Sequence, residues 1–218
     1  MEAAIFDLDG VLINSEPLHF SAAITLLRRL NIETTEEYHN QYVGSSDPVK
    51  WGKIIKEFNI QNSLQEILNM SVLTKLELLR QSDSYTPIEG IPELLKALKA
   101  HNIPIAVASS SPACFIKEVL NKVKIEKYIK TWVSGDDIEK SKPEPDIFLK
   151  TAELLQVNPR KCIVVEDSKN GVIAAKKAGM KCIGFKNINS GNQDLSRADV
   201  IVDNIQDINI YNLLSMEY

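Results

Sequence analysis

Short, continuous apolar runs constrain the fold of this chain more than any other feature. They are rich in Ile, Val and Ala, and they cover residues 3–6, 104–108, 162–165 and 182–185, with a weaker fifth run at 200–202. Runs of this kind are typical of parallel strands that are covered on both faces. Because helical patterns lie between most of them from residue 85 onward, we predict an α/β fold with a doubly wound parallel-sheet, Rossmann-like core.

A helical block interrupts this alternation. Apolar residues recur at a spacing of four over residues 16–30, and residues 51–58 and 64–79 also have helical patterns. The block is roughly 70 residues long, far longer than an ordinary crossover between two strands. We therefore predict a core domain formed by residues 1–14 and 85–218 and an inserted helical cap domain formed by residues 15–84.

Composition and charge narrow the range of partners. The net charge is −4, from 25 basic and 29 acidic residues, whereas a nucleic-acid-binding protein carries a basic face. The three cysteines, Cys114, Cys162 and Cys182, are odd in number and form no CxxC pair, which indicates reduced thiols. The chain shows no signal-peptide pattern and no run of about 18 apolar residues. We expect a cytoplasmic monomer with no membrane or nucleic-acid partner.

Two carboxylates follow the first apolar run, in the segment Asp7-Leu8-Asp9-Gly10. Side chains separated by one residue can point to the same side of an extended chain, and a glycine permits a sharp turn. Ligands of open α/β sheets bind at the carboxyl ends of the strands. The alternative is a strand that ends in a turn with solvated aspartates.

Hydroxyl groups follow the second apolar run, in the segment Ser109-Ser110-Ser111-Pro112. A hydroxyl at a strand end can donate to a phosphoryl oxygen. Helix capping is the alternative, and it is strongest for Ser111, which precedes a proline. We therefore predict a catalytic role for Ser109 and a capping role for Ser111, with Ser110 contacting the substrate.

A lysine and two further acidic residues complete the set of candidate active-site residues. Lys142 lies in a loop stiffened by two prolines, although a lone lysine is usually a solvated surface charge. Glu166 and Asp167 follow an apolar run, where acids are costly unless they are paired, hydrated or metal-bound, and capping by Asp167 or Ser168 is the alternative. Clustered carboxylates beside a lysine suit Mg²⁺ and a phosphoryl group.

These segments, taken in order, resemble the four motifs of the haloacid-dehalogenase superfamily. The resemblance covers the DxDGxL opening, the serine after an apolar strand, the KPxPD lysine loop and the ED-x-x-x-G segment that ends at Gly171. The helical block resembles the cap of the subgroup that includes β-phosphoglucomutase and many sugar-phosphate and nucleotide phosphatases.

The resemblance implies a role for each core residue. Asp7 would attack phosphorus and form an aspartyl-phosphate, while Asp9 would act as general acid and base and give its main-chain carbonyl to the metal. Asp7 and Asp167 would bind Mg²⁺ directly, with Glu166 close by or acting through water. Ser109 and Lys142 would hold the phosphoryl oxygens.

In the cap, the resemblance points to Ser15 and His19 as substrate-contacting residues. The mutases carry a Gly-x-Ser-Arg signature whose arginine binds a second phosphate, but this chain has Asp47 at the arginine position. A carboxylate there would repel a second phosphate, unless Lys50 or Lys53 offsets it, and Lys75 is the candidate for the cap lysine. We therefore expect a phosphatase for a small phosphorylated metabolite. The alternatives are a β-phosphoglucomutase-type mutase, a non-catalytic phosphoacceptor and a binding protein.

Overall fold

The computed structural model describes residues 1–209 and residue 213. Two compact units make up the chain. The core unit is formed by Met1–Asn14 and Tyr85–Tyr218, and the helical unit by Ser15–Ser84. In the part of the chain that the structure describes, no helix is long and apolar enough to cross a membrane.

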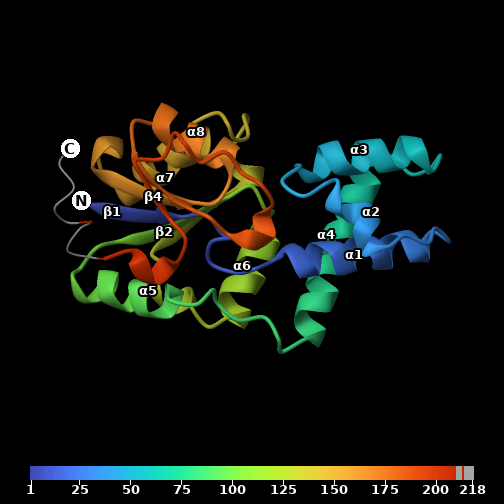
Figure 1. Cartoon of the computed structure of the whole chain (residues 1–218), viewed down its shortest axis with the longest axis horizontal. Coiled ribbons are helices and arrows are strands. Elements are labelled where there is room, and N and C mark those ends of the chain that lie inside the picture. The colour runs from blue at the N-terminus through green and yellow to red at the C-terminus, as the bar shows by residue number, and fades with distance from the viewer. Residues whose placement is uncertain (210–212, 214–218) are drawn as a thin grey trace. The chain divides into compact units, whose positions relative to one another are not determined.

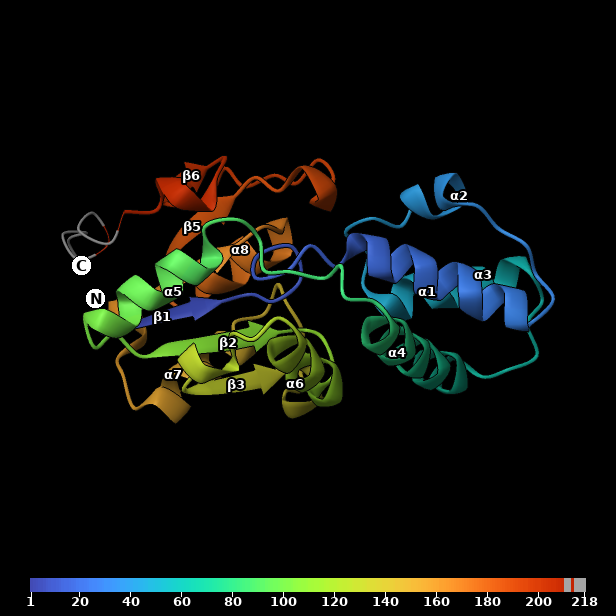
Figure 2. The ribbon, with the colours of Figure 1, turned by 90° about the horizontal axis from the view of Figure 1, so that it is seen from below.

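A parallel sheet organises the core unit, and Figure 2 shows its strands side by side. The strands are β1 (Ala3–Phe6), β2 (Ile105–Ser109), β3 (Thr131–Ser134), β4 (Cys162–Glu166), β5 (Lys181–Phe185) and β6 (Val200–Val202). Within the described residues they form one sheet in the order β3-β2-β1-β4-β5-β6, with every adjacent pair parallel. The predicted fold class is therefore confirmed. Every predicted strand is present, but β3 was not predicted.

Helices cover both faces of the sheet, with α7 and α8 over one face and α5 and α6 over the other (Figure 1). Their bounds are α5 Ile91–Ala100, α6 Ala113–Lys122, α7 Asp146–Leu155 and α8 Lys169–Lys177. Phe148 of α7 is fully buried against Ile5 of β1 and Val164 of β4. Burial of one such side chain stabilises the fold by about 1.5–3 kcal/mol.

Short 3₁₀ turns link these elements, namely η1 (Glu126–Tyr128), η2 (Gly135–Asp137), η3 (Pro159–Lys161), η4 (Ile188–Ser190) and η5 (Ile205–Asp207). Of the capping alternatives left open for Asp167 and Ser168, the structure shows Ser168 as the N-cap of α8. The Ser168 side chain accepts a hydrogen bond from the Gly171 N–H at 3.0 Å, and Gly179 has a φ of +76° just after the helix. These are the ordinary start and stop signals of a helix.

The helical unit contains α1 (Glu16–Arg29), α2 (Glu36–Asn40), α3 (Asp47–Glu57) and α4 (Leu64–Gln81). Trp51 is fully buried among Leu26, Leu27 and Ile67, which gives this unit a core of its own. Helix α3 begins four residues earlier than the sequence predicted, with Asp47 and Pro48 in its first turn. Acidic residues and proline are both favourable there, so Asp47 starts a helix as well as carrying a charge.

Candidate active site

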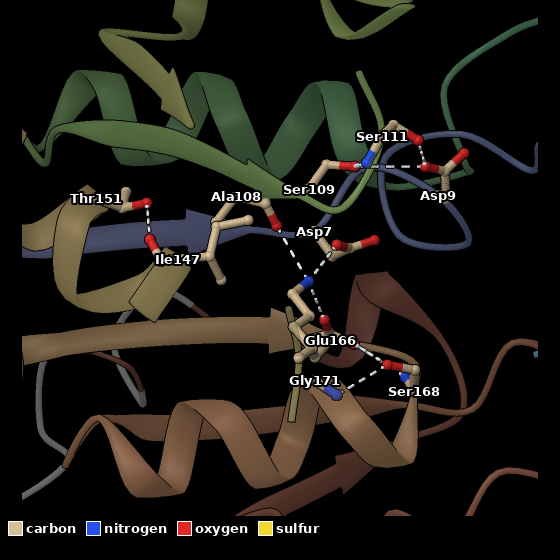
Figure 3. A network of polar contacts seen from close by, with 11 residues as sticks. Asp7, Asp9, Ala108, Ser109, Ser111, Ile147, Thr151, Glu166, Ser168 and Gly171 are labelled. Atoms are coloured by element: carbon tan, nitrogen blue, oxygen red, sulfur yellow. Dashed lines mark hydrogen bonds and ion pairs between the residues drawn. The ribbon is translucent and has the colours of Figure 1, made fainter. Parts of the chain in front are cut away.

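Lys142 lies at the centre of a buried group of charges at the carboxyl edge of the sheet. Its Nζ is 2.6 Å from Asp7 Oδ1 and 2.5 Å from Glu166 Oε1, and it donates to the Ala108 carbonyl at 3.1 Å. The dashed lines from Asp7, Ala108 and Glu166 meet at this nitrogen in Figure 3. We call Asp7, Lys142 and Glu166 the core cluster. Lys142 is therefore not a solvated surface charge, because only 7% of its side chain is exposed.

Burial and pairing act in opposite directions on the charges of this cluster. Burial disfavours the ammonium, but Asp7 and Glu166 outweigh it and raise the pKa of Lys142 above its usual value. Burial raises the pKa of Asp7, and the nearby Glu166 and Asp9 add to this effect against the pull of Lys142. The lysine is thus held as a cation, while Asp7 carries a charge that its surroundings only partly offset.

Both oxygens of Glu166 are engaged within the protein. Oε1 contacts Lys142, and Oε2 accepts hydrogen bonds from the Ser168 N–H at 3.0 Å and from its hydroxyl at 2.9 Å. Gly171 leaves the room for this carboxylate, since a Cβ there would lie 1.8 Å from Glu166 Oε1. These contacts make Glu166 a partner of Lys142, and its predicted place beside the metal, direct or through water, stays a prediction.

Asp9 is held by hydroxyl groups that follow β2. Ser111 Oγ donates to Asp9 Oδ2 at 2.6 Å, and Ser109 Oγ lies 3.4 Å from the same oxygen (Figure 3). The capping prediction for Ser111 is wrong, because α6 begins at Ala113 with Pro112 as its N-cap. The Ser111 hydroxyl therefore donates to Asp9 instead of accepting a hydrogen bond from a helix N–H.

Asp167 is buried and linked to a loop that the sequence did not single out. Its Oδ2 accepts a short hydrogen bond from the Ser190 hydroxyl, and Asn187 Nδ2 donates to the Gly10 carbonyl at 2.8 Å. A polar, glycine-containing stretch such as residues 187–193 is typical of a surface loop, but Asn187 and Ser190 are each only 8% exposed. A polar loop after a strand gives no sign in the sequence that it folds back onto the site.

The residues at this edge fit a magnesium ion by their chemistry. Asp7 and Asp167 are buried oxygen donors, and burial together with the charges of Glu166 and Asp7 raises the pKa of Asp167. Lys142 contacts the carboxylates of Asp7 and Glu166, and Asp167 adds a third carboxylate near them. No group of three or more Asp, Glu, His or Cys side chains is arranged as a metal site within the described residues. Mg²⁺ needs only one or two carboxylates beside water and phosphate oxygens.

A second buried ion cluster lies inside the helical unit. Asp47 Oδ1 is 2.8 Å from Lys50 Nζ, and Asp47 Oδ2 is 2.6 Å from Lys75 Nζ. We call these three residues the helical cluster. Burial opposes ionisation of Asp47, but Lys75, Lys50 and His19 outweigh it and hold its pKa well below the usual range. Of the alternatives left open for Asp47, the structure shows the one in which Lys50 offsets its charge, and Lys75 does so as well.

A small cavity of about 30 Å³ borders this cluster. Its lining consists of Glu16, His19, Phe20, Ala23, His39, Tyr42, Gly44, Ser45, Asp47 and Lys50. That volume holds about two water molecules. Burial and Lys50 lower the pKa of His39 to about 4, so its imidazole is neutral near pH 7. The cavity thus adds hydrogen-bonding groups beside the helical cluster.

The remaining candidates are positioned as follows. Ser110 is exposed just after β2, and Ser15 is buried at the N-cap position of α1. His19 lies one turn into α1 and lines the cavity of the helical unit. The substrate contacts assigned to these three residues remain predictions.

Comparisons with known proteins establish the family. Residues 4–185 match the family model described as haloacid dehalogenase-like hydrolase, which covers most of the chain. The chain belongs to the haloacid dehalogenase-like hydrolase family. The resemblance inferred from the four motifs is therefore confirmed.

The relatives include both phosphatases and mutases. A "Phosphorylated carbohydrates phosphatase" from Thermotoga maritima is 35% identical over 183 residues, which cover 84% of each chain. A "Beta-phosphoglucomutase" from Bacillus subtilis is 30% identical over 215 residues, which cover 96% of this chain and 92% of the relative. The crystal structure of a beta-phosphoglucomutase from Clostridium difficile is similar with a TM-score of 0.80 and 27% identity, over 98% of this chain and 96% of that one.

Proposed function

We propose that this protein is a magnesium-dependent phosphatase that hydrolyses a small phosphorylated carbohydrate, or a similar metabolite, through an aspartyl-phosphate on Asp7. The observation that carries the proposal is the core cluster, in which a buried lysine holds a buried aspartate beside the hydroxyl-bound Asp9. The likeness to a phosphatase of phosphorylated carbohydrates supports the substrate class.

In the first step, Asp7 attacks the phosphorus atom. Lys142 contacts Oδ1, which leaves Oδ2 as the attacking oxygen. A bond forms between Oδ2 and phosphorus while the bond from phosphorus to the leaving oxygen breaks. Asp9, in its protonated form, gives that oxygen a proton, so that an alcohol departs instead of an alkoxide.

In the second step, water hydrolyses the aspartyl-phosphate. Asp9 is now a carboxylate and takes a proton from the attacking water, which releases phosphate and restores Asp7. The Ser111 hydroxyl, 2.6 Å from Asp9 Oδ2, orients this carboxylate through both steps. Ser109 and Lys142 hold phosphoryl oxygens, and Lys142 also offsets the charge of Asp7.

Asp7, Asp167 and the main-chain carbonyl of Asp9 would hold the magnesium ion. When bound, the ion would offset the negative charge of the carboxylates and of the phosphoryl group, which otherwise repel each other. The core cluster by itself leaves a negative charge in surplus, which explains the need for a cation.

We assign substrate selection to the helical unit, as the proposed cap domain, where Ser15, His19 and Lys75 are the proposed contacts. In the core unit, the exposed Ser110 is a proposed contact. The helical cluster carries only one surplus positive charge, because Asp47 offsets one of its two lysines. A second phosphate carries about −1.5 to −2 charges, which this cluster would balance incompletely. Hydrolysis of a monophosphate is therefore favoured over mutase turnover, which requires a bisphosphate.

The test is phosphate release by the purified protein with magnesium, over a panel of phosphorylated sugars, nucleotides and glycolytic intermediates. The Asp7→Asn variant is the matched control. Mutase activity is the second candidate because of the similar beta-phosphoglucomutases. A coupled glucose 6-phosphate dehydrogenase assay, with β-glucose 1-phosphate and β-glucose 1,6-bisphosphate, separates the two. Conversion well above the rate of phosphate release would establish a mutase.

A further inference from the structure

The loop that follows β5 contacts two separate motifs of the candidate active site. Asn187 Nδ2 donates to the Gly10 carbonyl at 2.8 Å, in the turn that follows β1. Three residues later, the Ser190 hydroxyl donates to Asp167 Oδ2, just after β4. All of the partners lie in the core unit. One short polar segment thereby connects the ends of two strands that carry proposed metal ligands.

The loop is built so that the Ser190 hydroxyl has a fixed position. The Ser190 N–H donates to the Asn187 carbonyl at 3.1 Å, and the Ser190 carbonyl accepts from Gln193 Nε2 at 3.0 Å. Asn187 also caps the η4 turn, since its Oδ1 accepts from the Asn189 N–H at 2.9 Å. Held by both of its main-chain groups, Ser190 has little freedom to turn away from Asp167.

Gly10 completes a tight three-way contact with Asp167 and Ser190. It has a φ of +79°, in the left-handed region that favours glycine. A Cβ at this position would lie 2.0 Å from Asp167 Oδ2 and 2.8 Å from Ser190 Oγ. The absence of a side chain at Gly10 is thus what allows the hydroxyl and the carboxylate to meet there.

We propose that Ser190 is a positioning residue for the metal site: by donating to Oδ2, it directs Asp167 Oδ1 toward the magnesium ion. The inference rests on the proposed function. Asp167 is 6% exposed and lies near the like charges of Glu166 and Asp7, so its orientation needs a donor. Groups that hydrogen-bond to a metal ligand typically change metal affinity by about 10- to 100-fold when they are removed.

The test is magnesium binding to the metal-free, full-length protein, measured by isothermal titration calorimetry without substrate. Ser190→Ala should weaken magnesium affinity about 10- to 100-fold, and Ser190→Thr, which keeps the hydroxyl, should restore most of it. Ser196→Ala is the matched control and should leave the affinity unchanged, since Ser196 is exposed and donates to Asp194. If Ser190→Ala does not fold, Ser190→Cys keeps the volume with a weaker donor and should show the same loss.

A kinetic readout separates positioning from general damage. Raising the magnesium concentration should restore kcat of Ser190→Ala, while KM for the phosphate ester at saturating magnesium stays as in the wild type. Unchanged magnesium affinity in Ser190→Ala, or an equal loss in Ser190→Thr, would overturn the inference. If the wild type releases no phosphate from any ester but shows Ser190-dependent magnesium binding, the proposed function fails and the positioning role stands. If the wild type binds no magnesium at all, both fail.

Discussion

The two buried ion clusters of this chain are opposite in charge. In the core cluster, one lysine lies between the carboxylates of Asp7 and Glu166, whereas in the helical cluster one carboxylate lies between the ammonium groups of Lys50 and Lys75. The distances are similar, from 2.5 to 2.8 Å. With its groups ionised, the first is left with a surplus negative charge and the second with a surplus positive one.

The sign of the surplus charge decides which kind of ligand each cluster could accept, although both clusters are built from the same kind of ion pair. Burying a charged group costs free energy, and an ion pair offsets this cost only for groups that have a partner of opposite charge. In the proposed function, the surplus negative charge of the core cluster would attract a cation, and the cation would in turn attract a phosphoryl group. In the proposed function, the surplus positive charge of the helical cluster would favour an electron-rich group, such as a sugar hydroxyl or a weak anion. The predictions below change one charge at a time, beginning with the largest expected effect.

Replacing Asp7 with Asn should have the largest effect. The amide keeps the shape of the side chain but cannot attack phosphorus, so we expect phosphate release to fall by roughly 10³-fold or more. Circular dichroism should show an unchanged fold. Turnover above a few per cent of the wild-type rate, in a folded variant, would remove Asp7 as the nucleophile.

Replacing Asp9 with Asn should slow both chemical steps, by about 10²- to 10⁴-fold for an alkyl phosphate. An aryl phosphate such as p-nitrophenyl phosphate needs less protonation of its leaving group, so it should lose less. The ratio of the two losses is the measurement. Ser111→Ala should give a smaller loss of the same kind, because it only frees the orientation of Asp9. Equal losses on both substrates would contradict the role of Asp9 as the acid.

The two central residues of the clusters allow a direct comparison of stability. Lys142→Met leaves two buried carboxylates without their shared cation, and breaking a buried pair in this way costs about 3–5 kcal/mol. Asp47→Asn leaves two lysines without their shared carboxylate, but the side chain of Asp47 is 25% exposed against 7% for Lys142. We therefore expect the thermal midpoint to fall further for Lys142→Met. A larger fall for Asp47→Asn would mean that the helical cluster is the more tightly desolvated of the two.

The same Asp47→Asn variant tests the choice between hydrolase and mutase. Without the carboxylate, Lys50 and Lys75 both lose the negative charge of Asp47, and Lys50 lines the cavity. Affinity for β-glucose 1,6-bisphosphate should rise by about tenfold, roughly one charge-assisted contact, while affinity for a monophosphate changes little. Inhibition constants against the phosphatase reaction provide the measurement. Unchanged bisphosphate inhibition would show that the helical cluster does not face this part of the ligand.

The two carboxylates of the core cluster, Asp7 and Glu166, could be predicted from the sequence because they lie where apolar runs end. Continuous apolar runs mark buried strands, and in a parallel sheet the residues after them meet at one edge, which is how Asp7, Ser109 and Glu166 were brought together. The strand β3 was missed because its four residues contain only Trp132 and Val133 as an apolar run. Because β3 lies at the edge of the sheet and is only partly buried, it does not need a longer apolar run.

The contacts that the sequence did not predict join segments that are far apart along the chain and meet only in the folded protein. The pairing of Asp47 with Lys50 follows from helical spacing, but the contact with Lys75 joins positions 28 residues apart on two helices. The hydrogen bond from Ser190 to Asp167 likewise needs the path of a polar loop, and no periodic pattern records that path. Buried polar contacts of this kind are decided by tertiary packing, so they are the part that local sequence signals omit.

The smallest effect that we predict concerns His39, which borders the surplus positive charge of the helical unit. Burial and Lys50 lower its pKa from 6.5 to about 4, and within the described residues its Nδ1 has no hydrogen-bond partner. The unfolded chain therefore takes up a proton below about pH 6.5, whereas the folded chain does so only near pH 4. The unfolded state binds more protons in this window, so stability falls as the pH is lowered through it.

Between pH 7 and pH 5 this linkage should remove on the order of 1–2 kcal/mol of stability, or a few degrees in Tm. His39→Gln should lose less of its own stability over the same interval, because glutamine does not titrate. Thermal melts at both pH values provide the measurement. An equal pH dependence in the wild type and in His39→Gln would show that the charge beside His39 does not oppose its protonation, and that the helical cluster exerts less positive potential on its cavity than its two lysines suggest.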